Sequence, residues 1–132
     1  MKSLLIAALA TAILAISGNA AIPRETELEL QARAPEQLEI KIVTVKKKRR
    51  GGRYEITATG KVLKVRQSAA GLAADAELRI KYSVPARPIP GAPPAVVQKG
   101  KHYAAFLSKA DGGGHFCPAA ASGSFDLLAN DG

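Results

Sequence analysis

Apolar and polar residues alternate with a period of two over much of this chain, a pattern typical of β-strands that bury one face. The alternation begins at Leu38, which shares its predicted face with Ile40 and Ile42. It then changes phase, because Val43 and Val45 continue the apolar series one position later. A change of phase within a strand indicates a β-bulge or a sharp bend, and we expect one near Ile42.

A second strand with the same property follows a Gly-Gly turn at positions 51 and 52. Its apolar positions are Tyr54, Ile56 and Ala58, followed by Leu63 and Val65. The change of phase between these two groups predicts a bulge at Gly60. Two neighbouring strands that both change phase form a strongly coiled sheet, which is the kind of sheet that closes a small barrel.

Shorter strands are predicted at 78–84, 103–107 and 115–118, and residues 124–128 are expected to form an edge strand or one helical turn. Five prolines between Pro85 and Pro94 exclude that segment from a central ladder and predict an extended surface loop. The pattern therefore predicts an all-β fold, a small OB-like barrel of five to six strands over residues 38–128, with no long helix. An acidic segment at 21–37 is expected to be a loose N-terminal arm, and residues 129–132 a C-terminal tail.

The first twenty residues have the pattern of a signal peptide. Lys2 supplies a positive charge, an apolar run extends from Leu4 to Ile16, and small residues lead to Ala20, where signal peptidase would cleave. The apolar run is shorter than the roughly 20 helical residues needed to cross a bilayer. We therefore expect an exported protein, periplasmic or secreted, whose mature chain has no transmembrane segment.

Composition narrows the role further. The chain has 132 residues and a formal net charge of +8 at pH 7, which fits one domain and favours anionic partners. Cys117 is the only cysteine, so no intramolecular disulfide can form, and its neighbours Phe116 and Pro118 favour burial as an inert side chain. Export of an unfolded chain argues against a preloaded cofactor, and we expect none.

A run of cations, KKKRRGGR from Lys46 to Arg53, is the strongest local signal. The candidate anion-binding residues on this expected hairpin loop are Lys46, Lys47, Lys48, Arg49, Arg50 and Arg53. Such a cluster attracts phosphate, sulfate or carboxylate groups, but charged runs are more commonly solvated loops that resist aggregation. Five further cations fall on the outward phase of the predicted strands and would enlarge the patch: Lys41, Lys64, Arg66, Arg79 and Lys81.

An alternative function rests on His102, His115 and Cys117. An imidazole and a thiol two residues apart share one strand face, and His102 on the neighbouring strand would complete a metal or redox site. A blue-copper site would need a further His and a downstream Met, which the predicted mature chain lacks. A Cys–His nucleophile pair is also disfavoured, since two residues at this spacing on a strand do not meet in a hydrogen bond.

Other function classes are poorly supported by the sequence. The acidic residues are not placed as a catalytic pair, and no phosphate-binding glycine loop precedes a helix, so we do not expect an enzyme. OB-type barrels bind single-stranded nucleic acid by stacking bases on exposed aromatics, whereas Tyr54 and Tyr82 fall on inward positions and the chain is exported. Nucleic acid is therefore not an expected partner. The proline-rich loop could instead dock on a larger exported protein.

One piece of the chain carries a family resemblance. Gly100-Lys101-His102-Tyr103-Ala104-Ala105-Phe106-Leu107, placed before a Gly-rich turn and after a coiled hairpin, resembles the netrin-like modules of tissue inhibitors of metalloproteinases. The resemblance covers roughly Leu38 to Phe125 and implies an OB-type barrel. Those inhibitors chelate a protease zinc through a disulfide-held N-terminal cysteine, whereas this mature chain would begin near Ala21. Metalloprotease inhibition by that mechanism is therefore not carried over.

These observations predict an exported, non-catalytic binding module. Its expected partner is an anionic polymer, an anionic membrane surface or another exported protein.

Overall fold

The computed structural model describes residues 23–87 and 93–129, so the predicted signal peptide, the centre of the proline-rich loop and the last three residues lie outside the described residues. The described elements are α2 (Arg24–Arg33), β1 (Glu36–Arg50), β2 (Arg53–Ser68), β3 (Glu77–Pro85), β4 (His102–Lys109), β5 (Phe116–Pro118), the 3-10 helix η1 (Ala121–Gly123) and β6 (Phe125–Leu127). Within these ranges, none of the helices is both long enough and apolar enough to span a bilayer.

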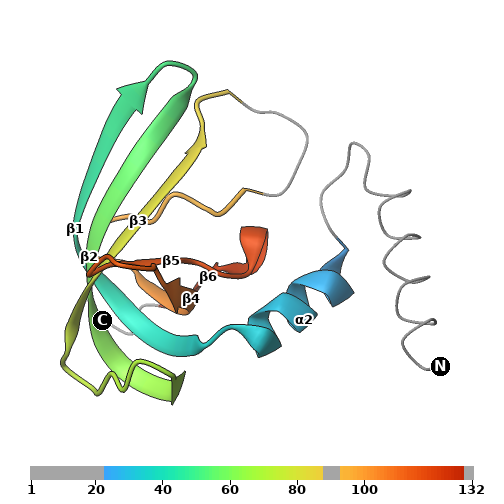
Figure 1. The fold of residues 1–132 in the computed structure, drawn as a ribbon, viewed down its shortest axis with the longest axis vertical. Helices are drawn as coiled ribbons and strands as arrows, with labels where there is room; N and C mark the ends of the chain where they lie inside the picture. The colour runs from blue at the N-terminus through green and yellow to red at the C-terminus, as the bar shows by residue number, and fades with distance from the viewer. Residues whose placement is uncertain (1–22, 88–92, 130–132) are drawn as a thin grey trace.

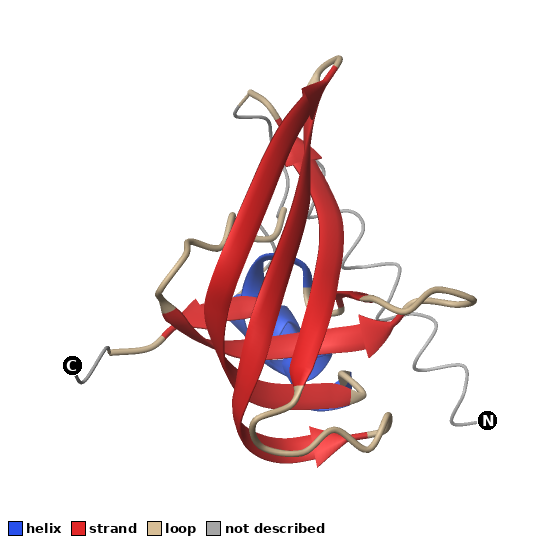
Figure 2. Cartoon of the chain, turned by 90° about the vertical axis from the view of Figure 1, so that its left-hand side faces the viewer, coloured by secondary structure: helices blue, strands red, loops and turns tan. Residues whose placement is uncertain are grey.

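Five strands close into a barrel, and a sixth lies outside it (Figures 1 and 2). The hydrogen-bonded order is β1-β2-β3-β5-β4, and a further pairing of β1 with β4 closes the ring. All pairs are antiparallel except β3 and β5, which are parallel and meet at Ile80 and Phe116. The outer strand β6 pairs with β4. The prediction of an all-β, OB-like barrel of five to six strands is confirmed.

Alternating side chains of every barrel strand fill the interior, as the period of two predicts. Leu38, Ile40 and Ile42 of β1 are almost fully buried. The rings of Tyr82 and Tyr103 pack against Phe125, with centroid separations of 5.5 and 6.1 Å. Burial of each of these isoleucine and leucine side chains contributes about 1.5–3 kcal/mol to the core.

The first strand bends where the sequence predicts. Ile42 pairs with Gly60, and the next pair in the ladder joins Thr44 to Thr59. Val43 is therefore the extra residue of a β-bulge, and its side chain is 37% exposed. The predicted bulge near Ile42 is confirmed.

The bulge predicted at Gly60 is wrong. The buried positions of β2 continue through Gly60 to Val62, and the extra residues of β2 are Leu63 and Arg66. Leu63 is 40% exposed rather than part of the core. Glycine is needed at position 60 for lack of space, because a Cβ at this position would lie 3.3 Å from Cδ1 of Ile40. The glycine lets the two strands approach over a buried isoleucine.

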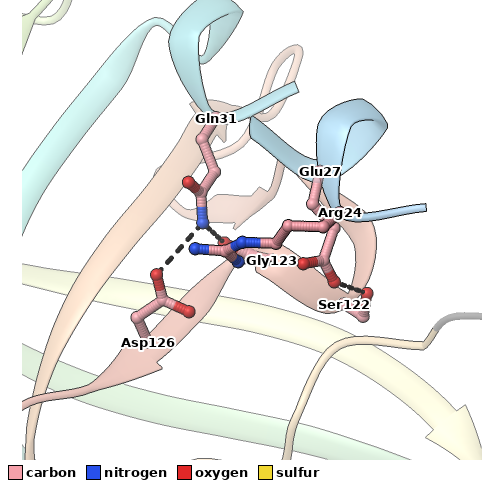
Figure 3. Close-up of polar contacts among 6 residues, drawn as sticks. All are labelled: Arg24, Glu27, Gln31, Ser122, Gly123 and Asp126. Atoms are coloured by element: carbon pink, nitrogen blue, oxygen red, sulfur yellow. Dashed lines mark hydrogen bonds and ion pairs between the residues drawn. The ribbon is translucent and has the colours of Figure 1, made fainter. Parts of the chain in front are cut away.

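The segment expected to be a loose arm instead contains α2 (Figure 1), and Figure 3 shows its polar contacts with the C-terminal part of the chain. The amide nitrogen of Gln31 donates hydrogen bonds to the carbonyl of Gly123 at 2.8 Å and to the carboxylate of Asp126 at 3.1 Å. One turn earlier, the Glu27 carboxylate accepts a hydrogen bond from the Ser122 hydroxyl. Two polar side chains four residues apart therefore fasten one face of α2 to η1 and β6.

A small apolar contact completes this attachment. Ala34, Phe106 and Ala120 are buried together, and Leu30 packs against them. The other leucine of the helix, Leu28, is 47% exposed. The helix thus has no continuous apolar stripe, which is why its sequence did not predict a packed helix.

Candidate anion-binding face

The run of cations belongs to a strand and not to a loop. β1 extends to Arg50, and the reversal consists of Gly51 and Gly52 alone, with Gly51 at a φ of +59°. The expectation of a charged hairpin loop is therefore wrong. Both views show the end of this hairpin extending away from the body of the barrel, with the end of β3 beside it (Figures 1 and 2).

Because successive residues of a strand point to opposite faces, the run divides into two sets. Val45 packs against the barrel core, so Lys47 and Arg49 share its inner side, while Lys46 and Lys48 point outward. Arg50 has the outward phase too. The run therefore presents three cations on its outer face and two on its inner face.

The two inner cations cover an aromatic ring. Nζ of Lys47 lies 4.6 Å from the centroid of the Tyr54 ring, and Cζ of Arg49 lies 5.9 Å from it. Arg49 is also the direct cross-strand neighbour of Tyr54. Contacts of this kind contribute about 0.5–1 kcal/mol at exposed sites. Lys47 and Arg49 therefore have a structural role in the projecting hairpin.

The arginines beside the turn also have partners within the chain. Nε of Arg50 lies 3.0 Å from the Glu55 carboxylate. Arg53 donates from Nε to the Ser83 hydroxyl at 3.0 Å and from Nη2 to the Ser83 carbonyl at 3.2 Å. Within the described part of the chain, neither Lys46 nor Lys48 forms an ion pair.

Lys46 borders a depression of about 400 Å³ on the outer face of β1, β2 and β3. Its lining residues are Thr44, Lys46, Thr57, Thr59, Arg79 and Lys81. The strand register places Thr57 between Lys46 and Lys81, and Thr59 between Thr44 and Arg79. Adjacent strands are about 4.8 Å apart, so three cations surround three hydroxyl groups within roughly 10 Å.

This lining favours anions on chemical grounds. Lysine and arginine supply charged donors, and each threonine hydroxyl can donate a further hydrogen bond. Charge-assisted hydrogen bonds to phosphate, sulfate or carboxylate are stronger than neutral ones. No carboxylate belongs to the lining of this depression.

A second depression lies at the turn. Its volume is about 460 Å³, and three guanidinium groups border it, those of Arg49, Arg53 and Arg87. It shares no lining residue with the first depression, and the surface between the two carries the Glu55 carboxylate.

Of the five other cations predicted to point outward from the strands, only some border the depression. Arg79 and Lys81 join Lys46 in the depression. Lys41 lies farther along the hairpin, beyond the Val43 bulge. Lys64 pairs with Glu39, and Arg66 is an extra residue near the far end of β2, so neither of these cations borders the depression.

The residues of the alternative metal or redox site are not brought together. His102 is the first residue of β4, whereas Cys117 pairs with Ser108 near the other end of the same strand. Six residues of β-strand span about 20 Å, so His102 is remote from both Cys117 and His115. Among residues 23–87 and 93–129, no group of three or more His, Cys, Asp or Glu side chains is placed to hold a metal ion.

The burial of Cys117 also differs from the prediction. The sequence favoured a buried, inert thiol, but Cys117 is a free cysteine of intermediate exposure. Its neighbour Phe116 takes the core position instead, with 6% of its surface exposed.

Sequence reasoning did not single out the threonines as site residues. Thr44, Thr57 and Thr59 alternate with apolar positions, which does predict that they point outward. Threonine is common in strands for its shape alone, so nothing marked these hydroxyls as functional. These threonines lie beside cations because of the register of three paired strands. That register cannot be read from the sequence alone.

Comparison of the chain with protein-family models, with curated protein sequences and with solved structures finds no match. The resemblance to netrin-like modules therefore stays a prediction.

Proposed function

We propose that this protein is an exported, non-catalytic binding module that holds an anionic partner on the outer face of β1, β2 and β3. The observation that carries the proposal is the arrangement of Lys46, Arg79 and Lys81 around Thr57 and Thr59. These donors come from three hydrogen-bonded strands. Their backbone positions are fixed before any partner arrives, which lowers the entropic cost of binding.

The partner class follows from the shape and charge of this face. The cations of the depression come from β1 and β3, on either side of β2. A partner with many anionic groups in series, such as a sulfated or phosphorylated polysaccharide, would contact cations on both strands. The net charge of +8 would also attract such a polymer over longer distances.

A nucleic acid fits this face less well. Binding of single strands depends on aromatic rings that stack on bases. Tyr82, Tyr103 and Phe125 pack on one another in the barrel. Tyr54 lies on the inner side of the hairpin, where Lys47 and Arg49 cover its ring. The outer depression itself has no aromatic lining residue.

The test is binding of the purified protein to heparin, a sulfated polysaccharide, with elution by increasing salt. A triple variant with Lys46→Gln, Arg79→Gln and Lys81→Gln should elute at much lower salt than the parent protein, since its charged donors are lost. The matched control replaces three exposed cations that lie outside the depression, Lys64→Gln, Arg66→Gln and Lys109→Gln. Equal losses in the two variants would show an effect of net charge alone and would refute a site on this face.

A further inference from the structure

A third hollow lies on the other side of the Val43 bulge from the anion-binding depression. Its volume is about 570 Å³, within the range of small-molecule sites. The lining residues that bear on its chemistry are Lys41, Val43, Lys61, Leu63, Lys99 and His102. It differs from the first depression because apolar and cationic side chains meet in it.

The apolar part of the lining results from two β-bulges. Val43 is the extra residue of β1, and Leu63 is an extra residue of β2. Their side chains are 37% and 40% exposed, and both line the same hollow. Regular pairing would alternate inward and outward positions through this region, and the two bulges instead bring two aliphatic side chains to the outer surface.

The cations form a rim around these aliphatic side chains. Lys41 lies directly opposite Lys61 on one side and His102 on the other. Lys99 comes from the loop before β4, whose backbone continues the ladder: the amide of Gly100 donates to the Ile42 carbonyl at 2.7 Å. The loop is therefore fixed against β1, and Lys99 is held at the rim.

This arrangement has an unfavourable feature that an anion would relieve. Like charges directly opposite on neighbouring strands repel, as Lys41 and Lys61 do. Nζ of Lys61 lies 3.6 Å from the Asp75 carboxylate, but both side chains are exposed, and such pairs contribute little. A bound carboxylate or phosphate between the two lysines would neutralise the repulsion.

We propose that this hollow binds a single-chain anionic amphiphile, a carboxylate with an aliphatic tail. The head group would lie between Lys41 and Lys61, and the tail would cover Val43 and Leu63. A free amphiphile fits better than a lipid surface, because aliphatic side chains that line a hollow do not protrude into a bilayer. This site uses none of the residues of the anion-binding depression, so it does not depend on the function proposed above.

The test is an NMR titration of the isotopically labelled protein with decanoate below its micelle concentration. Saturable shifts are expected at residues 41–43, 61–63 and 99–102. Decanol lacks the charge and acetate lacks the tail, so each should bind at least about tenfold more weakly. Leu63→Ser should weaken the binding of decanoate by a similar factor. Leu127→Ser, which changes a 63% exposed leucine outside the hollow, should leave this binding unchanged.

Several outcomes would overturn the proposal. Equal affinities for decanoate and acetate would show that the hollow binds the charged group alone. Equal affinities for decanoate and decanol would show that it binds the aliphatic tail alone. Sedimentation with phosphatidylglycerol vesicles that depends on Leu63, without saturable decanoate shifts, would assign the hollow to a lipid surface. Leu63-dependent dimerisation would assign it to a second copy of the chain. Heparin elution of Leu63→Ser should match the parent protein, which separates this site from the polyanion face.

Discussion

Lys46 of β1 and Lys81 of β3 lie on either side of Thr57 of β2, each as its direct cross-strand neighbour. Two strand spacings separate the backbones of these lysines, about 10 Å in total. Because both strands pair with β2, this separation is set by the backbone of the sheet. The backbone positions that carry the charges of the outer face are thus fixed, which a mobile loop would not provide.

The attachment of α2 should depend on pH. The hydrogen bond from Ser122, together with the nearby Arg24 guanidinium at 3.1 Å, lowers the pKa of Glu27 below its ordinary value. The unfolded chain therefore takes up this proton first as pH falls. The stabilisation by Glu27 is present above the ordinary carboxyl pKa of about 4.3 and is lost as pH falls through the lower pKa of the folded protein.

Denaturant unfolding of the parent protein and of Glu27→Gln tests this prediction. At pH 7 the variant should be less stable by about 0.5–1.5 kcal/mol, the usual contribution of one hydrogen bond. At pH 3 the difference between the two proteins should shrink. A difference that stays constant from pH 7 to pH 3 would contradict the role of the ionised carboxylate.

Tyr82 should titrate late. Burial raises the pKa of Tyr82 to about 12. Its hydroxyl donates to the carbonyl of Ala95 at 2.7 Å and accepts from the amide of Val97 at 3.1 Å. Since the folded pKa exceeds the ordinary value of about 10, this contribution to stability is complete below pH 10 and is lost as pH rises toward 12.

Tyrosinate absorbance measured against pH should show this late step, and Tyr82→Phe should remove it. The same variant leaves two backbone groups of the 95–97 segment without their hydroxyl partner, which should cost about 1–3 kcal/mol of unfolding free energy. A titration curve with the same late step in Tyr82→Phe would contradict the assignment.

Gly60→Ala should destabilise the barrel. The added Cβ would lie 3.3 Å from Cδ1 of Ile40, a fully buried side chain that would have to shift by a few tenths of an ångström. Overpacking of this kind costs about 1–3 kcal/mol, which thermal unfolding would detect. Gly52→Ala is the control, since nothing lies within 4 Å of a Cβ there. Equal melting temperatures for Gly60→Ala and the parent protein would show that the strands need no close approach.

The strands and the barrel could be predicted because their apolar residues alternate. The helix α2 could not, since Gln31 and Glu27 attach it through polar groups on η1 and β6 that are remote in sequence. Leu63 was misplaced for a related reason: an apolar residue in a strand is expected to be buried, and only the register shows that a bulge exposes it.

The candidate site was predicted in part. The run that begins at Lys46 does mark a cationic region. Its charges suggested a solvated loop. The pairing of Lys46 with Thr57 shows instead that the run is part of a strand, with cations on both faces. The partners Arg79 and Lys81 were expected on the outward phase, and the structure places them beside Lys46. The predicted metal site is wrong because most of the length of β4 lies between His102 and Cys117. Residue types alone do not reveal this distance.

The most direct test of the central claim compares two double variants within the same run of five cations. Lys46→Gln with Lys48→Gln removes outer-face charge, and Lys47→Gln with Arg49→Gln removes the same charge from the inner face. Salt elution from heparin should fall strongly for the outer pair and only slightly for the inner pair, whose main effect should be a loss of about 0.5–1 kcal/mol in stability. Elution at the same salt concentration for both variants would contradict an anion-binding outer face.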